Sequence, residues 1–142
     1  MIYLDTSWLV KLYVEEDDSD GVRALVAADP TVAVSDLCFV EMHSAVARRR
    51  REGKMAARVA SAVLGRFRRE WTDRHRVAVS AEVIARAADL VAAHPLRSLD
   101  AVRLASALLV AEGAPEPVRF GAGDKNLIAA ARSEGLLALS GE

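Results

Sequence analysis

The sequence predicts an α/β fold, in which a parallel sheet of five strands is covered by helices on both faces. The first observation behind this prediction is that short apolar segments alternate with longer segments of helical periodicity along the chain. The second is the composition, because 52% hydrophobic and 27% charged residues in a chain of 142 suit one compact domain with its own core. No repeat or linker divides the chain, so we predict one domain over residues 1–142.

The first half of the chain is predicted to contain two strands and four helices. The apolar run at residues 2–4 predicts a strand that ends at Asp5, and Leu9 and Tyr13 then lie at helical spacing. The following elements are a helix at 18–28, a strand at 31–34, and two long helices at 36–52 and 54–71 that Gly53 separates. In the second long helix, the residues of one apolar stripe are Ala60, Val63, Leu64, Phe67 and Trp71.

The second half continues the alternation of strands and helices. Its helices end at recognisable signals, such as His94-Pro95, Gly113 and Gly135. The predicted elements are strands at 77–79, 118–120 and 136–139, with helices at 81–93, 98–111 and 125–133.

Charge is strongly segregated along this chain. Residues 48–76 carry a net charge of +8 and the remaining residues −9, although the whole chain is only −1. Residues 36–76 therefore form a basic helical arm, which suggests a polyanionic partner, although a solvated helix face would explain the same charges. The candidate nucleic-acid contacts on the arm are Arg48, Arg49, Arg50, Arg51, Lys54 and Arg58.

Several classes of protein are disfavoured by the sequence. It has no uninterrupted apolar segment of about 18 residues and no signal-peptide pattern, so we expect a cytoplasmic protein without a membrane span. The single cysteine, Cys38, cannot form an internal disulfide and has no partner at zinc-binding spacing. A bound metal is therefore expected to have oxygen ligands.

Four acidic residues occupy positions that suggest a site. Asp5 and Asp124 follow predicted strands, at the sheet edge where ligands bind in α/β folds. Asp100 lies in the first turn of a helix in an apolar setting, and Glu41 is predicted to share a core-facing stripe with Leu37, Val40 and Ser44.

Each acid also has a structural explanation. Asp5 and Asp124 could cap helices, Asp100 could complement a helix dipole, and Glu41 could pair with Arg103. If the four carboxylates converge instead, a cation must offset their repulsion, and oxygen ligands favour Mg²⁺, with Mn²⁺ as a substitute. Such an ion activates water and offsets the charge of a phosphoryl transition state, which points to cleavage of a nucleic acid held by the arm.

At this level of detail the chain resembles the PIN-domain nucleases, and among them the VapC-type ribonuclease toxins of bacterial toxin-antitoxin pairs. The matching segments cover nearly the whole chain: MIYLDTSWLVKLYVEE at the start, Val40-Glu41, LRSLDAVRLASAL around Asp100, and FGAGDKNLIAAARSEGL around Asp124. The resemblance implies a five-stranded parallel sheet between helices, in agreement with the prediction above.

The resemblance also implies roles for individual residues. It makes Asp5, Glu41, Asp100 and Asp124 the quartet that binds Mg²⁺ and positions water, with Thr6 and Ser7 as supporting hydroxyls. One departure is Ala122, which stands where the family often has Thr or Ser and puts the contribution of Asp124 in doubt. The implied partners are an RNA substrate, a VapB-like antitoxin and a second copy of the chain in a homodimer.

We therefore expect a Mg²⁺-dependent endoribonuclease that acts as the toxin of such a pair. A non-catalytic nucleic-acid-binding module is the first alternative, and Ala122 makes it plausible. A small phosphohydrolase of the haloacid dehalogenase type ranks lower, because that family has a second aspartate where this chain has Ser7.

Overall fold

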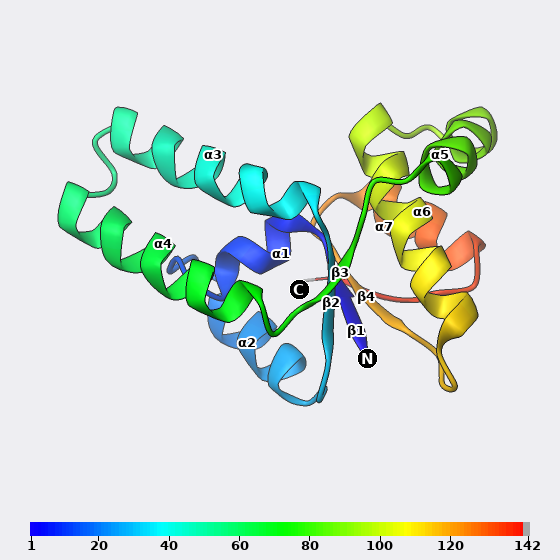
Figure 1. Cartoon of the computed structure of the whole chain (residues 1–142), viewed down its shortest axis with the longest axis horizontal. Coiled ribbons are helices and arrows are strands. Elements are labelled where there is room, and N and C mark those ends of the chain that lie inside the picture. Colours follow the sequence, from blue (N-terminus) through cyan, green and yellow to red (C-terminus); the bar gives the residue numbers. More distant parts are fainter. Residues whose placement is uncertain (141–142) are drawn as a thin grey trace.

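A computed structural model describes residues 1–140 and confirms the α/β fold with five parallel strands (Figure 1). Residues 141 and 142, which belong to the predicted domain, lie outside this range. The elements, in chain order, are β1 (Ile2–Leu4), α1 (Thr6–Lys11), α2 (Ser19–Ala27), β2 (Val32–Ser35), α3 (Leu37–Arg51), α4 (Ala57–Trp71), β3 (His75–Val77), α5 (Ala81–Ala93), α6 (Ser98–Gly113), β4 (Arg119–Gly121), α7 (Lys125–Ser133) and β5 (Leu137–Leu139).

The strand order places β1 at the centre of the sheet. The order is β3-β2-β1-β4-β5, and every neighbouring pair is parallel. Ile2 pairs with Val32 on one side and with Arg119 on the other, so β1, β2 and β4 end near one another. Polar residues that follow β1 and β4 therefore meet at the carboxyl edge of the sheet, as expected for a ligand site in this fold class.

The two faces of the sheet carry separate hydrophobic cores. Ile2 and Leu4 point into the core shared with α1–α4, whereas Tyr3 points into the core shared with α5–α7, as the two-residue period of a strand requires. Figure 1 shows these two groups of helices on opposite sides of the sheet. The first half of the chain thus covers one face, and the second half covers the other.

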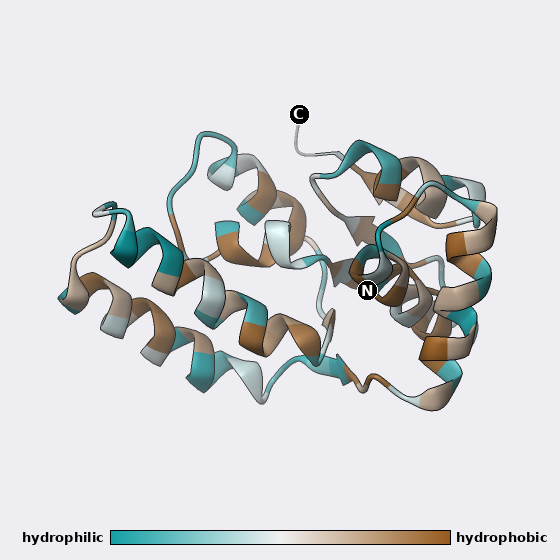
Figure 2. Ribbon diagram, turned by 90° about the horizontal axis from the view of Figure 1, so that it is seen from above, coloured by the Kyte–Doolittle hydropathy of each residue, from teal (hydrophilic) through white to brown (hydrophobic). Residues whose placement is uncertain are grey.

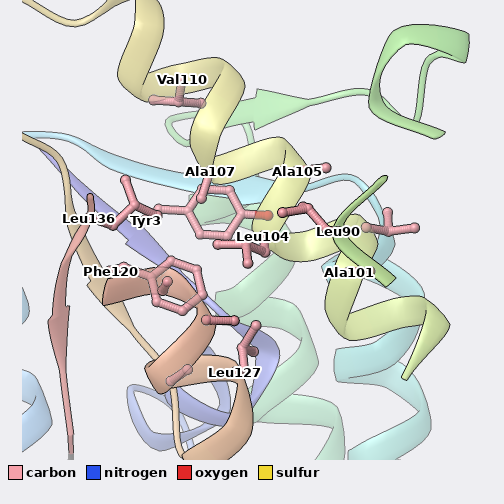
Figure 3. Packing of buried hydrophobic residues seen from close by; sticks show 14 of the residues in the cluster. Tyr3, Leu90, Ala101, Leu104, Ala105, Ala107, Val110, Phe120, Leu127 and Leu136 are labelled. Atoms are coloured by element: carbon pink, nitrogen blue, oxygen red, sulfur yellow. The ribbon is translucent and has the colours of Figure 1, made fainter. Parts of the chain in front are cut away.

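Close packing in both cores fixes the central strands. Tyr3 stacks on Phe120 of β4 with their ring centroids 5.7 Å apart, and Figure 3 shows the Tyr3 ring beside Leu104 and Ala107 of α6 and the Phe120 ring near Leu127. On the opposite face, the six-membered ring of Trp8 lies so close to Gly121 that a Cβ atom there would overlap it. Gly121 is therefore required for α1 to approach β4.

The helices α3 and α4 pack against each other and extend away from the sheet as the predicted arm (Figures 1 and 2). The predicted apolar stripe of α4 is confirmed, because Ala60, Phe67 and Trp71 are buried and Val63 and Leu64 are half-buried. Figure 2 shows hydrophilic residues gathered at the far end of the arm. Within residues 1–140, no helix combines the length and apolar character needed to cross a membrane.

Two predicted boundaries were wrong. The third strand is His75–Val77 rather than 77–79, because β3 is an edge strand whose polar residues face solvent while its backbone pairs with β2. The helix α4 begins at Ala57 rather than at residue 54, since the preceding chain reverses at Gly53, where φ is +71°. The first error follows from reading a strand from side-chain apolarity, which does not report backbone pairing, and the second from starting the helix directly after Gly53.

Candidate active site

Three of the four predicted acids converge at the carboxyl edge of the sheet. Asp5 follows β1, Glu41 lies on α3, and Asp100 lies in the first turn of α6. All three contact one side chain, the guanidinium of Arg103. The site therefore joins elements from both faces of the sheet.

Arg103 stands at the centre of this acidic group. Its Nε atom lies 2.9 Å from Oδ1 of Asp5, its Nη1 atom donates to Oδ1 of Asp100 at 2.7 Å, and its Nη2 atom donates to Oε2 of Glu41. Only 10% of the Arg103 side chain is exposed. A buried guanidinium needs such carboxylate partners, and they need it, because a buried charge without a partner is strongly destabilising.

Two hydroxyl groups complete the contacts of these acids. The hydroxyl of Ser7 donates to Oδ2 of Asp5 at 2.8 Å and accepts from the backbone N–H of Gly123 at 3.1 Å. The hydroxyl of Thr6 lies 3.0 Å from Oε1 of Glu41. Ser7 thus supports Asp5 and ties it to the loop after β4, whereas Thr6 supports Glu41 rather than Asp5.

Asp124 lies at the rim of the site. It caps α7 by accepting from the backbone N–H of Leu127 at 2.9 Å, and its other carboxylate oxygen lies 4.0 Å from Nη2 of Arg97. The Nε atom of Arg97 donates to Asp100 at 3.0 Å. Arg97 therefore connects Asp124 to the other acids.

The electrostatics of Asp100 reflect this crowding. Burial raises the pKa of Asp100, Arg97 acts against that change, and the negative charges of Asp5 and Asp124 add to the increase. Asp5 and Asp124 are thus close enough to Asp100 for their negative charges to disfavour its ionised form. A cation placed among them lowers the free energy of their charged forms.

The structural explanations of these acids hold alongside their convergence. Asp5 and Asp124 do cap helices, Asp100 does lie in a first turn, and Glu41 does pair with Arg103. Capping directs a carboxylate toward the start of a helix, which is also the carboxyl edge of the sheet. A structural role and a place in the site are therefore compatible.

The predicted position of Glu41 on its helix was wrong. The buried face of α3 consists of Cys38, Met42 and Val46, whereas Val40, assigned to the same stripe as Glu41, is 61% exposed. Glu41 instead lies at the edge of the buried face, toward α1, because its carboxylate is held by Thr6 and Arg103.

The basic arm approaches the site at Arg48. A cavity of about 250 Å³ beside the acids is lined by Thr6, Ser7, Val10, Glu41, Ser44, Ala45 and Arg48. Arg48 is two helical turns from Glu41, so both line the same cavity.

The other candidate contacts on the arm differ in their freedom to bind a partner. Arg49 forms an ion pair with Glu16 at 2.5 Å, and Lys54 forms one with Glu52 at 3.1 Å. Arg50, Arg51 and Arg58 are exposed at the far end of the arm. The predicted role of these residues in binding nucleic acid stays a prediction.

Sequence reasoning missed Arg97 as a component of the site and considered Arg103 only as a partner for Glu41. A usable signal was present for Arg103, which lies within an otherwise buried stretch of α6 and three residues after Asp100. Arg97 gave no signal, because it is exposed and directly precedes its helix.

The donor set suits a hard divalent cation, although the acids do not form a ready-made cage. No group of three metal-binding side chains is poised for an ion within residues 1–140. Arg103 takes up the space between Asp5, Glu41 and Asp100, and Arg97 stands between Asp100 and Asp124. The donors are nevertheless all carboxylate oxygens, the ligands that Mg²⁺ and Mn²⁺ prefer.

Comparison with known proteins identifies a family and its relatives. A family model described as "PIN domain" matches residues 2–132. Two proteins named Ribonuclease VapC45 and Ribonuclease VapC49, from two strains of Mycobacterium tuberculosis, are each 33% identical to this chain over 116 residues. The matches cover 79% of this chain and 78% of each relative.

Solved structures share the fold at low sequence identity. FitAcB from Neisseria gonorrhoeae matches with a TM-score of 0.75 and 14% identity, covering 99% of this chain and 98% of that one. A toxin-antitoxin complex from Klebsiella pneumoniae matches with a TM-score of 0.68 and 17% identity, covering 100% and 98%. Mycobacterium tuberculosis VapC20, a toxin that cleaves the sarcin-ricin loop, matches with a TM-score of 0.67 and 22% identity, covering 92% and 95%.

Proposed function

The chain belongs to the PIN-domain family, and on that premise we propose that it is a metal-dependent endoribonuclease and the toxin of a VapBC-like toxin-antitoxin pair. The observation that carries this proposal is the convergence of Asp5, Glu41 and Asp100 around one guanidinium at the carboxyl edge of the sheet. The two relatives named as VapC ribonucleases support the same activity.

The proposed ligands of the metal are Asp5, Glu41, Asp100 and Asp124. Mg²⁺ is the proposed ion, with Mn²⁺ as a substitute, and when bound it supplies an acidified water and positive charge for the transition state. Ser7 holds the carboxylate of Asp5 in place, and Thr6 does the same for Glu41. Arg103 keeps these carboxylates together and reduces their mutual repulsion.

The arm is proposed to hold the RNA beside these acids. Arg48 lines the cavity next to Glu41, so its guanidinium can bind a phosphate close to the one that is hydrolysed. Arg50, Arg51 and Arg58 would then bind phosphates farther along the strand. The proposed site of action is the cytoplasm, since the proposed substrate is cellular RNA.

The proposed partner is a VapB-like antitoxin, and the Klebsiella pneumoniae toxin-antitoxin complex that shares the fold supports such a partner. A homodimer stays a prediction. Both assemblies can be measured by the mass of the purified toxin, alone and with a co-expressed antitoxin.

The experiment that tests this function is cleavage of total cellular RNA by the purified protein. We expect discrete fragments with Mg²⁺ or Mn²⁺ and intact RNA with EDTA. Asp5→Asn should abolish cleavage, whereas Asp89→Asn, the same change at an exposed position on α5 outside the site and the arm, should not.

Two other results would replace this proposal. RNA that the wild-type protein binds but leaves intact would assign a non-catalytic binding module. Metal-dependent hydrolysis of an aryl phosphate, with RNA left intact, would assign a small-molecule phosphohydrolase.

A further inference from the structure

Every carboxylate oxygen of the four acids lies within 4.0 Å of a hydrogen-bond donor or a charged partner, although Oδ1 of Asp5 and Nε of Arg103 form an ion pair without a hydrogen bond. Asp5 is held by Arg103 and Ser7, and Glu41 by Arg103 and Thr6. The remaining two acids are held by Arg103, Arg97 and the backbone of α7: Asp100 by both arginines, and Asp124 by Arg97 and the N–H of Leu127. A divalent cation placed among these oxygens therefore competes with the two arginines for them.

The two arginines differ greatly in what their displacement would cost. The side chain of Arg103 is 10% exposed and contacts three carboxylates, so its removal would leave buried charges without a partner. The side chain of Arg97 is 80% exposed and makes one short contact, to Asp100. An exposed ion pair contributes little, so Arg97 can return to water at small cost.

We propose that Arg97 is an exchangeable counter-ion of this site: a divalent cation displaces it from Asp100 and Asp124 while Arg103 stays, and the released guanidinium then binds a phosphate of the RNA. This inference rests on the proposed function of the site as a metal-dependent ribonuclease.

The position of Arg97 suits both its release from the acids and its binding of an RNA phosphate. It directly precedes α6, its side chain is exposed, and it contacts Asp124 and the carboxylate oxygen of Asp100 that Arg103 does not contact. Once released, its guanidinium stays tethered beside the acids and faces solvent. A guanidinium in that position can bind a phosphate through two parallel hydrogen bonds.

The exchange predicts changes of opposite sign in two affinities. Arg97→Gln removes the competitor of the cation, so the protein should bind Mn²⁺ about two- to fivefold more tightly, the change expected for one exposed ion pair. The same variant should bind RNA more weakly, and the slope of log affinity against log salt should fall by about 0.7 for one lost phosphate contact. A merely structural role would not move the two affinities in opposite directions.

The test uses calorimetric titration of the purified protein with MnCl₂ in the absence of RNA. A second measurement is the binding of a 2′-O-methyl single-stranded oligoribonucleotide in MnCl₂ by fluorescence anisotropy, over a range of salt concentrations. The matched control is Arg23→Gln, because Arg23 also bridges two acids, Glu15 at 2.8 Å and Asp20 at 3.2 Å, away from the site. Thermal unfolding of both variants confirms that they are folded.

The outcomes separate this inference from the proposed function. Tighter Mn²⁺ binding and weaker RNA binding by Arg97→Gln, with Arg23→Gln like the wild type, would support the exchange. Unchanged or weaker Mn²⁺ binding by Arg97→Gln, with measurable binding by the wild type, would overturn the exchange and leave the proposed function intact. Failure of the wild-type protein to bind Mn²⁺ would overturn the proposed metal site and the exchange together.

Discussion

Arg103 and Glu41 are 62 residues apart in the sequence and form an ion pair across the carboxyl edge of the sheet. Glu41 lies on a helix that covers one face of the sheet, and Arg103 lies on a helix that covers the other. Their contact connects the two layers at the point where the acids meet. The stability of the site and the stability of the fold are therefore coupled through Arg103.

Arg103→Met should destabilise the protein in the absence of metal. The substitution leaves the carboxylates of Asp5, Asp100 and Glu41 close together without their shared cation. We expect the free energy of unfolding to fall by about 3–5 kcal/mol, the cost of breaking a buried ion pair by removing one partner. Urea denaturation in EDTA measures this change, and addition of Mn²⁺ should recover part of it.

The control for this prediction is Arg86→Met. Arg86 pairs with Glu112 on the surface, 2.5 Å away, so its loss should cost less than about 1 kcal/mol. Equal effects of the two substitutions would show that Arg103 contributes packing and little electrostatic stabilisation.

Arg48 and Arg49 should differ in their contribution to RNA binding although they are adjacent. Arg48→Gln removes an exposed charge beside the acids, so affinity should fall and the salt slope should decrease by about 0.7. Arg49→Gln should have a smaller effect, because Arg49 is already paired with Glu16. Fluorescence anisotropy over a range of salt concentrations measures both, and equal losses would contradict the argument.

Gly121→Ala should destabilise the fold through overpacking. A Cβ atom at this position overlaps the buried ring of Trp8, and we expect a loss of about 1–3 kcal/mol in the free energy of unfolding. Gly113→Ala is the matched control, since nothing lies within 4 Å of its Cβ position and alanine favours the helix. A cost at Gly121 no larger than at Gly113 would mean that α1 can shift away from β4.

The thiol of Cys38 should make stability depend on alkaline pH. Burial raises the pKa of Cys38 to about 11, whereas the pKa of a thiol in an unfolded chain is about 8.5. Deprotonation thus favours the unfolded chain, so the free energy of unfolding should fall as the pH rises from 8.5 toward 11. Relative to Cys38→Ala, the wild type should lose about 2 kcal/mol by about pH 10.

Urea denaturation of the wild type and of Cys38→Ala between about pH 7 and 10 isolates the effect of the thiol, because every other titratable group is present in both proteins and cancels in the difference. Parallel pH profiles would show that the thiol ionises as easily in the folded protein as in the unfolded chain.

The fold was predictable because its signals are local. Residues 2–4 are apolar and end at an acid, and the structure has a buried strand there with Asp5 at its end. The edge strand His75–Val77 was displaced in the prediction, since its exposed residues are held by backbone hydrogen bonds that carry no side-chain signature.

The acids of the candidate site could be picked out from the sequence, whereas most contacts of its two arginines could not. The four acids stand out as charges in apolar or post-strand positions, so the sequence alone marks them. The pairing of Arg103 with Glu41 was offered as one explanation of that acid, whereas its contact with Asp5 depends on how α6 lies against the end of β1, which no local pattern reports. The same limit explains the wrong face assigned to Glu41, whose orientation is set by its partners.

The order of the elements along the chain also decides which parts of the candidate site are synthesised first. A chain extended only through α5 contains the whole basic arm, Asp5 and Glu41, and it lacks both arginines and the other two acids. Even β4, the neighbour of β1 beside which Asp124 emerges, is added after α6. The basic arm is therefore synthesised well before the proposed cleavage site is complete, because Asp100 and Asp124 lie in the part of the chain that is made last.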